Sequence, residues 1–235
     1  MWALRRCFLL VLVSGVLSGC QLVLAATDGP RGSSVPGSTA EGWSNAREAL
    51  ASLEVKGRAP KTGYDREVFG PAWSDDVDVP GGHNGCDSRN DLLARALTGI
   101  QLKPGTHGCV VLSGSMIDPY TGRRLEFRRG ASTVDVDHVV ALGDAWQKGA
   151  QRWTPQKRRD FANDPANLLA VSASANRSKG DGDAATWLPP LRSARCGYAV
   201  RQIDVKKKYQ LWVTKAERAA LTEILDRCPT GADGA

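Results

Sequence analysis

Four cysteines, Cys86, Cys109, Cys196 and Cys228, constrain the fold of this chain more than any other feature. An even number of separated cysteines in an exported chain indicates disulfides. Of the three pairings, we expect Cys86 with Cys109 and Cys196 with Cys228, because these are near neighbours in sequence. The alternative is a zinc site, but zinc sites use closely spaced ligand pairs, and these four residues are far apart.

The N-terminus indicates export. Residues 1–19 begin with a charged start and continue with an apolar run of about ten residues and a small-residue exit, which is the pattern of a signal peptide. The run is shorter than the roughly 20 residues of a transmembrane helix. Leu17-Ser18-Gly19-Cys20 resembles the bacterial lipobox, so we expect a lipid on Cys20 that anchors the chain to the membrane. The alternative is cleavage after Val23-Leu24-Ala25, which would release a freely secreted protein.

The remaining chain has the length of one domain. Residues 20–44 are rich in Gly, Ser, Pro and Thr and predict a flexible linker, residues 45–229 form the domain, and 230–235 are a tail. Loss of the leader with its two arginines lowers the formal net charge from +6 to +4. This mildly basic balance suits a polyanion such as nucleic acid but is weak evidence alone.

Periodicity and capping residues predict mixed helices and strands. We expect a β-hairpin that pairs 124–127 with 134–140, and an aromatic loop over 63–80 with Tyr64, Phe69 and Trp73 turned inward. The turn DPYTG covers 118–122, and Thr214 to Glu217 reads as a capping box. Helices are expected over 45–55, 88–97, 142–151, 154–163, 174–180, 193–209 and from 214 to before Cys228, and a short strand over 109–112.

Three separated pieces carry residues with catalytic chemistry: VDVDHVV with Asp137 and His138, NDPANLL with Asn167, and SANRSKGD with Asn176 and Lys179. Each has a structural explanation by itself, as a buried histidine, a turn residue or the start of a helix. Their combination resembles the HNH nuclease family and the HNH segment of CRISPR effector nucleases.

A longer run, from about Tyr64 to Cys228, resembles exported actinobacterial HNH proteins with a domain of the DUF1524 type. This resemblance implies an α+β fold in which a ββα-metal core, about 123–190, is wrapped by additional helices. It also implies a metal-dependent endonuclease that hydrolyses phosphodiester bonds of DNA.

The family pattern and the chemistry assign roles to five residues. His138 is the general base, since a neutral imidazole accepts a proton at physiological pH. Asp137 and Asn176 offer oxygen ligands to Mg²⁺ or Mn²⁺. Asn167 completes the catalytic set by orienting the loop beside the histidine. Lys179 is a candidate phosphate or leaving-group contact, with an exposed surface lysine as the alternative.

We expect a monomer without a small-molecule cofactor. Asparagines in place of the second and third family positions favour Mg²⁺ or Mn²⁺ over zinc or nickel. Asp135 stays unassigned. The alternative function is a noncatalytic lipoprotein that binds nucleic acid or an envelope component and keeps the HNH frame for structural reasons.

Overall fold

The computed structural model describes residues 40–130 and 133–229, which fall within one compact unit, Val35–Ala235. The expected leader, the lipid site at Cys20, the linker up to residue 39 and the tail 230–235 lie outside the described residues. None of the described helices is both long and apolar enough to span a bilayer.

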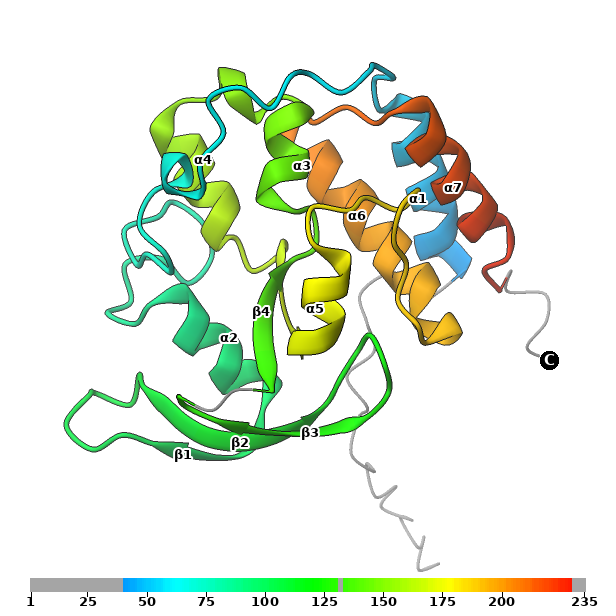
Figure 1. The fold of residues 1–235 in the computed structure, drawn as a ribbon. Helices are drawn as coiled ribbons and strands as arrows, with labels where there is room; N and C mark the ends of the chain where they lie inside the picture. The colour runs from blue at the N-terminus through cyan, green and yellow to red at the C-terminus, as the bar shows by residue number, and fades with distance from the viewer. Residues whose placement is uncertain (1–39, 131–132, 230–235) are drawn as a thin grey trace, which may run out of the picture. The chain divides into compact units, whose positions relative to one another are not determined.

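The described residues form an α+β fold, as expected (Figure 1). The strands make one three-stranded and one two-stranded antiparallel sheet. In chain order the elements are α1 (Ala40–Ser52), η1 (Arg66–Phe69), α2 (Ser88–Ala96), β1 (Thr98–Leu102), β2 (Val111–Ile117), β3 (Arg124–Arg128), β4 (Val134–His138), α3 (Leu142–Gln147), η2 (Ala150–Arg152), α4 (Pro155–Asn163), β5 (Leu168–Ser172), α5 (Ala173–Lys179), η3 (Arg192–Ala194), α6 (Arg195–Tyr209) and α7 (Lys215–Asp226), where η denotes a short 3₁₀ helix.

The ββα core consists of β4, β5 and α5. β4 pairs with β5 in antiparallel register, with Val136 opposite Ala170 and His138 opposite Leu168. α5 begins immediately after β5 and packs against both strands. Both strands are largely buried, so each is paired with a strand that is itself buried along most of its length.

The expected hairpin between 124–127 and 134–140 is therefore wrong. β3 pairs with β2 instead, with Ser115 opposite Glu126, and β1 adds the third strand of that sheet. The turn after β2 explains this pairing, because the Asp118 carboxylate accepts hydrogen bonds from the Tyr120 N–H and the Thr121 hydroxyl. β3 is exposed along most of its length and cannot cover the buried β4.

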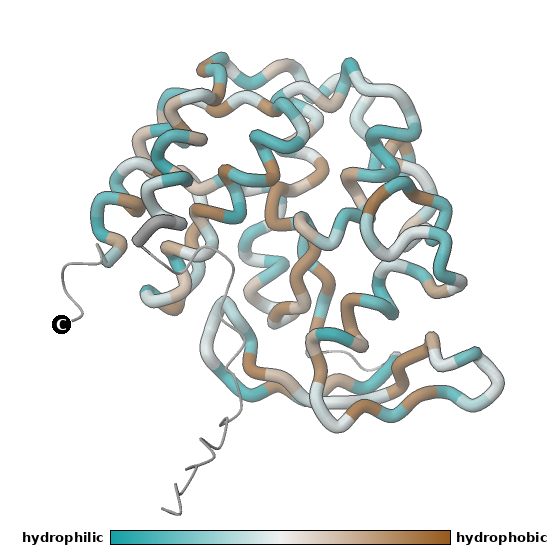
Figure 2. Tube along the Cα trace, turned by 180° about the vertical axis from the view of Figure 1, so that it is seen from behind, coloured by the Kyte–Doolittle hydropathy of each residue, from teal (hydrophilic) through white to brown (hydrophobic). Residues whose placement is uncertain are grey.

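The segment from Val134 to Val140 lies where three hydrophobic clusters meet. Val134 and Val136 pack with residues of α2, β2 and β3, whereas Val139 packs with residues of α1, α6 and α7. Val140 belongs to a third cluster with residues of α3 and α4. The tube in Figure 2 shows hydrophobic stretches in this central part of the domain. Because packing surrounds the segment, the end of β4 is held rigidly.

Helix caps agree with the sequence in most places. Asp87 caps α2 by accepting from the Asn90 N–H at 2.8 Å, and Thr154 caps α4 directly before Pro155. Thr214 caps α7 by accepting from the Glu217 N–H, as in a capping box. The Glu217 carboxylate, however, pairs with two buried lysines, so its role differs from that of a capping-box glutamate.

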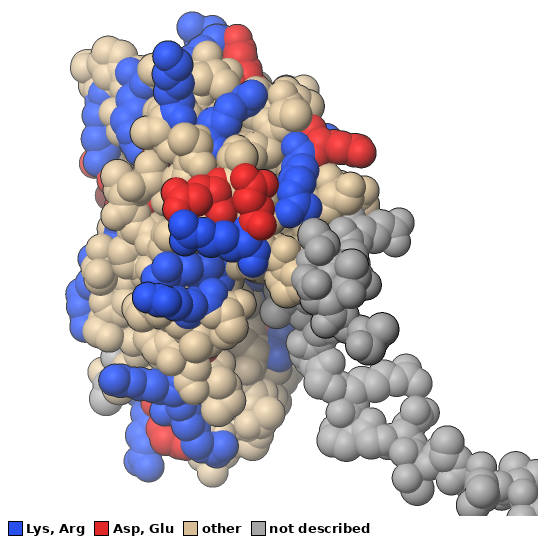
Figure 3. All heavy atoms as spheres, turned by 90° about the vertical axis from the view of Figure 1, so that its right-hand side faces the viewer, with Lys and Arg blue, Asp and Glu red and all other residues tan. Residues whose placement is uncertain are grey.

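Both expected disulfides are present, Cys86–Cys109 and Cys196–Cys228, and the zinc alternative for these cysteines is wrong. On the side where α7 lies, Lys and Arg side chains spread over the surface with a group of Asp and Glu among them (Figure 3). Positive charge alone does not mark a binding site on this side.

Candidate active site

His138 ends β4 with its ring buried, and a hydrogen bond fixes its tautomer. Its Nε2 atom lies 2.8 Å from the Ala162 carbonyl oxygen. A carbonyl oxygen only accepts, so Nε2 carries the proton and Nδ1 is the basic nitrogen. Burial lowers the pKa of His138 from 6.5 to about 3; the Ala162 bond opposes this effect, and the positive charge of Arg66 adds to it. The imidazole is therefore neutral at physiological pH.

Trp73 covers one face of this imidazole. The two rings stack with an interplanar angle of 8° and centroids 5.7 Å apart. Trp73 adopts a left-handed backbone conformation, with φ of 59°, which is costly for a bulky residue and persists only where the surroundings enforce it.

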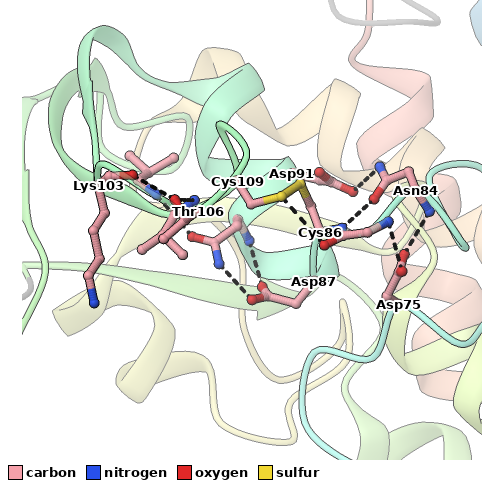
Figure 4. Close-up of a disulfide and its surroundings, with 12 residues drawn as sticks. Asp75, Asn84, Cys86, Asp87, Asp91, Lys103, Thr106 and Cys109 are labelled. Atoms are coloured by element: carbon pink, nitrogen blue, oxygen red, sulfur yellow. Dashed lines mark hydrogen bonds between the residues drawn. A yellow bond between two sulfur atoms is a disulfide. The ribbon is translucent and has the colours of Figure 1, made fainter.

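The loop that follows Trp73 is held closed by hydrogen bonds and a disulfide (Figure 4). The Asp75 carboxylate accepts from the Asn84 and Gly85 N–H groups at 3.0 and 2.9 Å. The next residue, Cys86, is joined to Cys109. Residues distant from the nuclease motif thus support the tryptophan that covers His138.

Asp137 points to the other side of β4, and both of its oxygens accept hydrogen bonds. The Tyr120 hydroxyl donates to Oδ2 at 2.6 Å, and the Lys179 ammonium donates to Oδ1 at 2.8 Å. Lys179 also donates to the His138 carbonyl oxygen, so it joins α5 to the end of β4. Burial raises the pKa of Asp137, and the charge and hydrogen bond of Lys179 oppose this rise. Lys179 is buried, so the surface-lysine alternative is wrong.

Asn176 lies half-buried on α5 and faces the same side of β4. Its amide nitrogen is 3.4 Å from Asp135 Oδ2, a weak contact that leaves the amide oxygen available. Asn176, Asp137 and His138 line one cavity of about 180 Å³. The structure therefore brings together three candidate residues from two elements.

The donor set of this cavity fits a magnesium-type ion. A carboxylate and an amide oxygen are hard ligands, and Mg²⁺ usually completes its shell with waters. No group of three or more His, Cys, Asp or Glu within the described ranges could hold a metal, so a site here has to be sparse. A cation at Asp137 has to compete with the Lys179 ammonium on Oδ1.

Asn167 is fully buried and does not line this cavity. Its side-chain oxygen accepts from the Val140 N–H at 2.8 Å, while its amide group donates to the Phe161 carbonyl at 3.4 Å. These bonds join the exit of β4 to the end of α4, where Ala162 accepts from His138. Asn167 is thus placed to orient the histidine through the backbone.

Sequence reasoning missed three neighbours of these residues. The sequence placed Tyr120 only in a turn and Trp73 only among inward-packed aromatic residues. It gave no role to Arg66, which lines the cavity shared by Asp137, His138 and Asn176. The aromatic content of 63–80 was the available signal, and it did not indicate which ring meets His138.

Two antiparallel strands followed directly by a helix, with Asp137-His138 at the end of the first strand and Asn176 on the helix, define a nuclease-type domain of the HNH kind. Residues 87–224, more than half of the chain, match the family described as GmrSD restriction endonucleases, C-terminal domain. The chain belongs to this family.

One curated relative is similar over most of both chains. An uncharacterized secreted protein of Arthroderma benhamiae is 40% identical over 187 residues, which are 79% of this chain and 85% of that protein. No solved structure matches this chain.

Proposed function

We propose that this protein is an exported, metal-dependent endonuclease that hydrolyses phosphodiester bonds of DNA. One observation carries the proposal: His138, with its basic nitrogen Nδ1, shares a cavity with the oxygen ligands Asp137 and Asn176. Membership of a restriction endonuclease family supports a nuclease chemistry.

In the proposed reaction, Nδ1 of His138 takes a proton from a water molecule as that water attacks the phosphorus atom. The bond between phosphorus and the leaving oxygen breaks, and the leaving oxygen takes up a proton from solvent. Burial makes His138 a weak base, so the imidazolium that forms depends on the negative charge of the phosphate for stabilisation. The Ala162 carbonyl holds the ring in one tautomer, and Asn167 supports this stretch of backbone through its bond to the carbonyl of the preceding residue, Phe161.

Asp137 and Asn176 would hold a single Mg²⁺ or Mn²⁺ ion, which when bound stabilises the charge on the phosphate and the leaving oxygen. Lys179 has a different role in this proposal from the phosphate or leaving-group contact that the sequence suggested. Because its ammonium binds Asp137 and the His138 carbonyl, it opposes the rise that burial causes in the pKa of Asp137 and holds the end of β4 in place.

Export is proposed from the leader and the two disulfides, and the description of the relative as secreted supports it. Attachment to the membrane through a lipid on Cys20 follows from residues 17–20. We propose that the protein acts as a monomer.

A second function is favoured by the bonds of Asp137. Because Lys179 and Tyr120 already engage both carboxylate oxygens, the ββα unit is stable as it stands and could serve a noncatalytic protein that binds nucleic acid. The two functions differ in whether bound substrate is cut.

The test is to incubate the purified protein with supercoiled plasmid, linear duplex DNA, single-stranded DNA and RNA, each with Mg²⁺, Mn²⁺ or EDTA. If the protein is an endonuclease, we expect the plasmid to be nicked and then linearised with either ion, and to stay supercoiled in EDTA. Binding in a gel-shift assay without cleavage under all these conditions would support the noncatalytic function.

A further inference from the structure

Two cavities meet at His138, and the residues shared by both are Arg66, His138 and Leu142. The smaller, of about 180 Å³, contains Asp137 and Asn176. The larger, of about 660 Å³, lies on the Trp73 side of the ring. Arg66 therefore stands beside the candidate base at the junction of the two spaces.

Arg66 is the one Lys or Arg among the described residues that lines either cavity. The acidic groups of the smaller cavity are already neutralised, since Asp137 pairs with Lys179 at 2.8 Å and Asp181 pairs with Lys61 at 2.6 Å. The Arg66 guanidinium makes no hydrogen bond or ion pair with any residue that the structure describes. A positive charge without an ion-pair partner among the described residues thus remains next to His138.

In the larger cavity, negatively charged side chains without ion-pair partners outnumber the positive one. Asp65 and Glu67 also line it, and neither carboxylate forms an ion pair with a described residue. The Asp65 carboxylate accepts from the Glu67 N–H and caps η1. Electrostatics therefore favour an anion on the side of Arg66 that faces the smaller cavity.

The backbone that carries Arg66 is anchored, although its side chain is exposed. Phe69 is buried against the rings of Trp146 and Phe161, and Arg158 donates to the Val68 carbonyl at 2.8 Å. A fixed backbone with an unpartnered guanidinium suits ligand binding, because little ordering of the chain is required.

We propose that Arg66 is the phosphate-binding residue of this site, supplied by a segment that precedes the family-matched residues 87–224. The guanidinium fork would hold two nonbridging oxygens of the phosphodiester and place its phosphorus atom in the smaller cavity beside His138. Arg66 thereby takes the role that the sequence suggested for Lys179, which is committed to Asp137. The assignment rests on the proposed nuclease function.

The test compares Arg66→Ala and Arg66→Lys with the wild type. The control is Arg192→Ala, since Arg192 is also an exposed arginine of a 3₁₀ helix but lines a separate cavity. One assay measures kcat and KM for plasmid nicking. A second measures, by fluorescence anisotropy, the affinity of a labelled duplex DNA in EDTA at several salt concentrations.

We expect Arg66→Ala to lower kcat/KM by about 10²- to 10³-fold and to reduce the salt slope of binding by about one unit. Arg66→Lys should recover part of the activity, and Arg192→Ala should match the wild type. Thermal unfolding should not change, because Arg66 has no partner in the fold to lose.

If Arg66→Ala keeps the kcat/KM and the salt slope of the wild type, the proposal for Arg66 is overturned while the nuclease function stays intact. If the wild type binds DNA without cutting it, the nuclease function fails. The role of Arg66 in phosphate binding is then tested by whether Arg66→Ala reduces the salt slope of binding. If the wild type neither binds nor cuts DNA, both proposals fail.

Discussion

His138 is kept neutral by burial and kept in one tautomer by the Ala162 carbonyl, and each effect has a separate structural source. Trp73 excludes water from one ring face, whereas Asn167 holds the backbone that carries the accepting carbonyl. The basicity and the orientation of the histidine can therefore be changed independently by substitution.

Replacing Trp73 with alanine should raise the pKa of His138 from about 3 toward its ordinary 6.5, because the ring gains contact with water. NMR titration of the histidine signals measures this value. Trp73→Phe keeps an aromatic cover and should change the value less. An unchanged pKa in Trp73→Ala would show that the stacked ring does not control the environment of His138.

Lys179→Met should destabilise the ion-free protein by about 3–5 kcal/mol, since Asp137 then remains as a buried carboxylate without its cation. Mn²⁺ should restore more stability to this variant than to the wild type, because the ion no longer competes with the ammonium. Urea unfolding in EDTA and in Mn²⁺ measures both effects. Equal responses of variant and wild type to Mn²⁺ would exclude competition at Asp137.

For single residues, the sequence predicted which side chains form the site better than it predicted the contacts that they make. The resemblance to the HNH pattern was sufficient to expect Asp137, His138 and Asn176 in one site, because that pattern brings the two elements together. The inward turn of Lys179 and the bond from Tyr120 depend on how α5 and the turn after β2 pack against β4. Local patterns contain no such information.

Among the elements, β4 shows where local patterns mislead. Two neighbouring strands joined by a short turn predicted a hairpin, yet β4 pairs with β5, about 30 residues later in the chain. The burial of both strands on both faces decides the pairing, and burial is a property of the whole domain. Caps, by contrast, are local: Thr214 caps α7 as its sequence predicted, and Asp87 and Thr154 cap α2 and α4 through bonds to residues three positions later.

The Cys86–Cys109 disulfide should contribute to the site as well as to stability. It closes a loop with a sequence separation of 23, and its removal by Cys86→Ser with Cys109→Ser should cost about 3 kcal/mol. Because the loop after Trp73 ends at Cys86, kcat should also fall. The matched control, Cys196→Ser with Cys228→Ser, should lower stability alone; equal loss of kcat in both variants would refute the special role of the first disulfide.

For the whole molecule, a group of buried charges joins elements that are distant in sequence. Lys148, directly after α3, contacts Asp144, Asp183 and Glu217, while Lys206 on α6 contacts Asp144 and Glu217. Burial raises the pKa of Asp144, but the two lysines outweigh burial and lower it from 3.8 to about 2. The group stabilises the packing of α3, α6 and α7 as long as its carboxylates are ionised.

The free energy of unfolding should therefore decrease as the pH falls over a defined acidic range. Since Asp144 has a lower pKa in the folded than in the unfolded state, its contribution is present above pH 3.8 and is lost as pH falls toward 2. The expected loss from this residue is roughly 2 kcal/mol. Urea unfolding between pH 5 and 2 should show a shallower decline for Asp144→Asn than for the wild type. Parallel curves would mean that Asp144 does not contribute to acid sensitivity.

The central claim is that His138 activates water for cleavage of DNA. The most direct measurement is the plasmid nicking rate in Mn²⁺ of the wild type, His138→Ala and the control His107→Ala, which changes an exposed loop histidine. The account predicts a loss of about 10²- to 10⁴-fold for His138→Ala and none for His107→Ala, with DNA binding retained in both. Nicking by His138→Ala at the wild-type rate would contradict it.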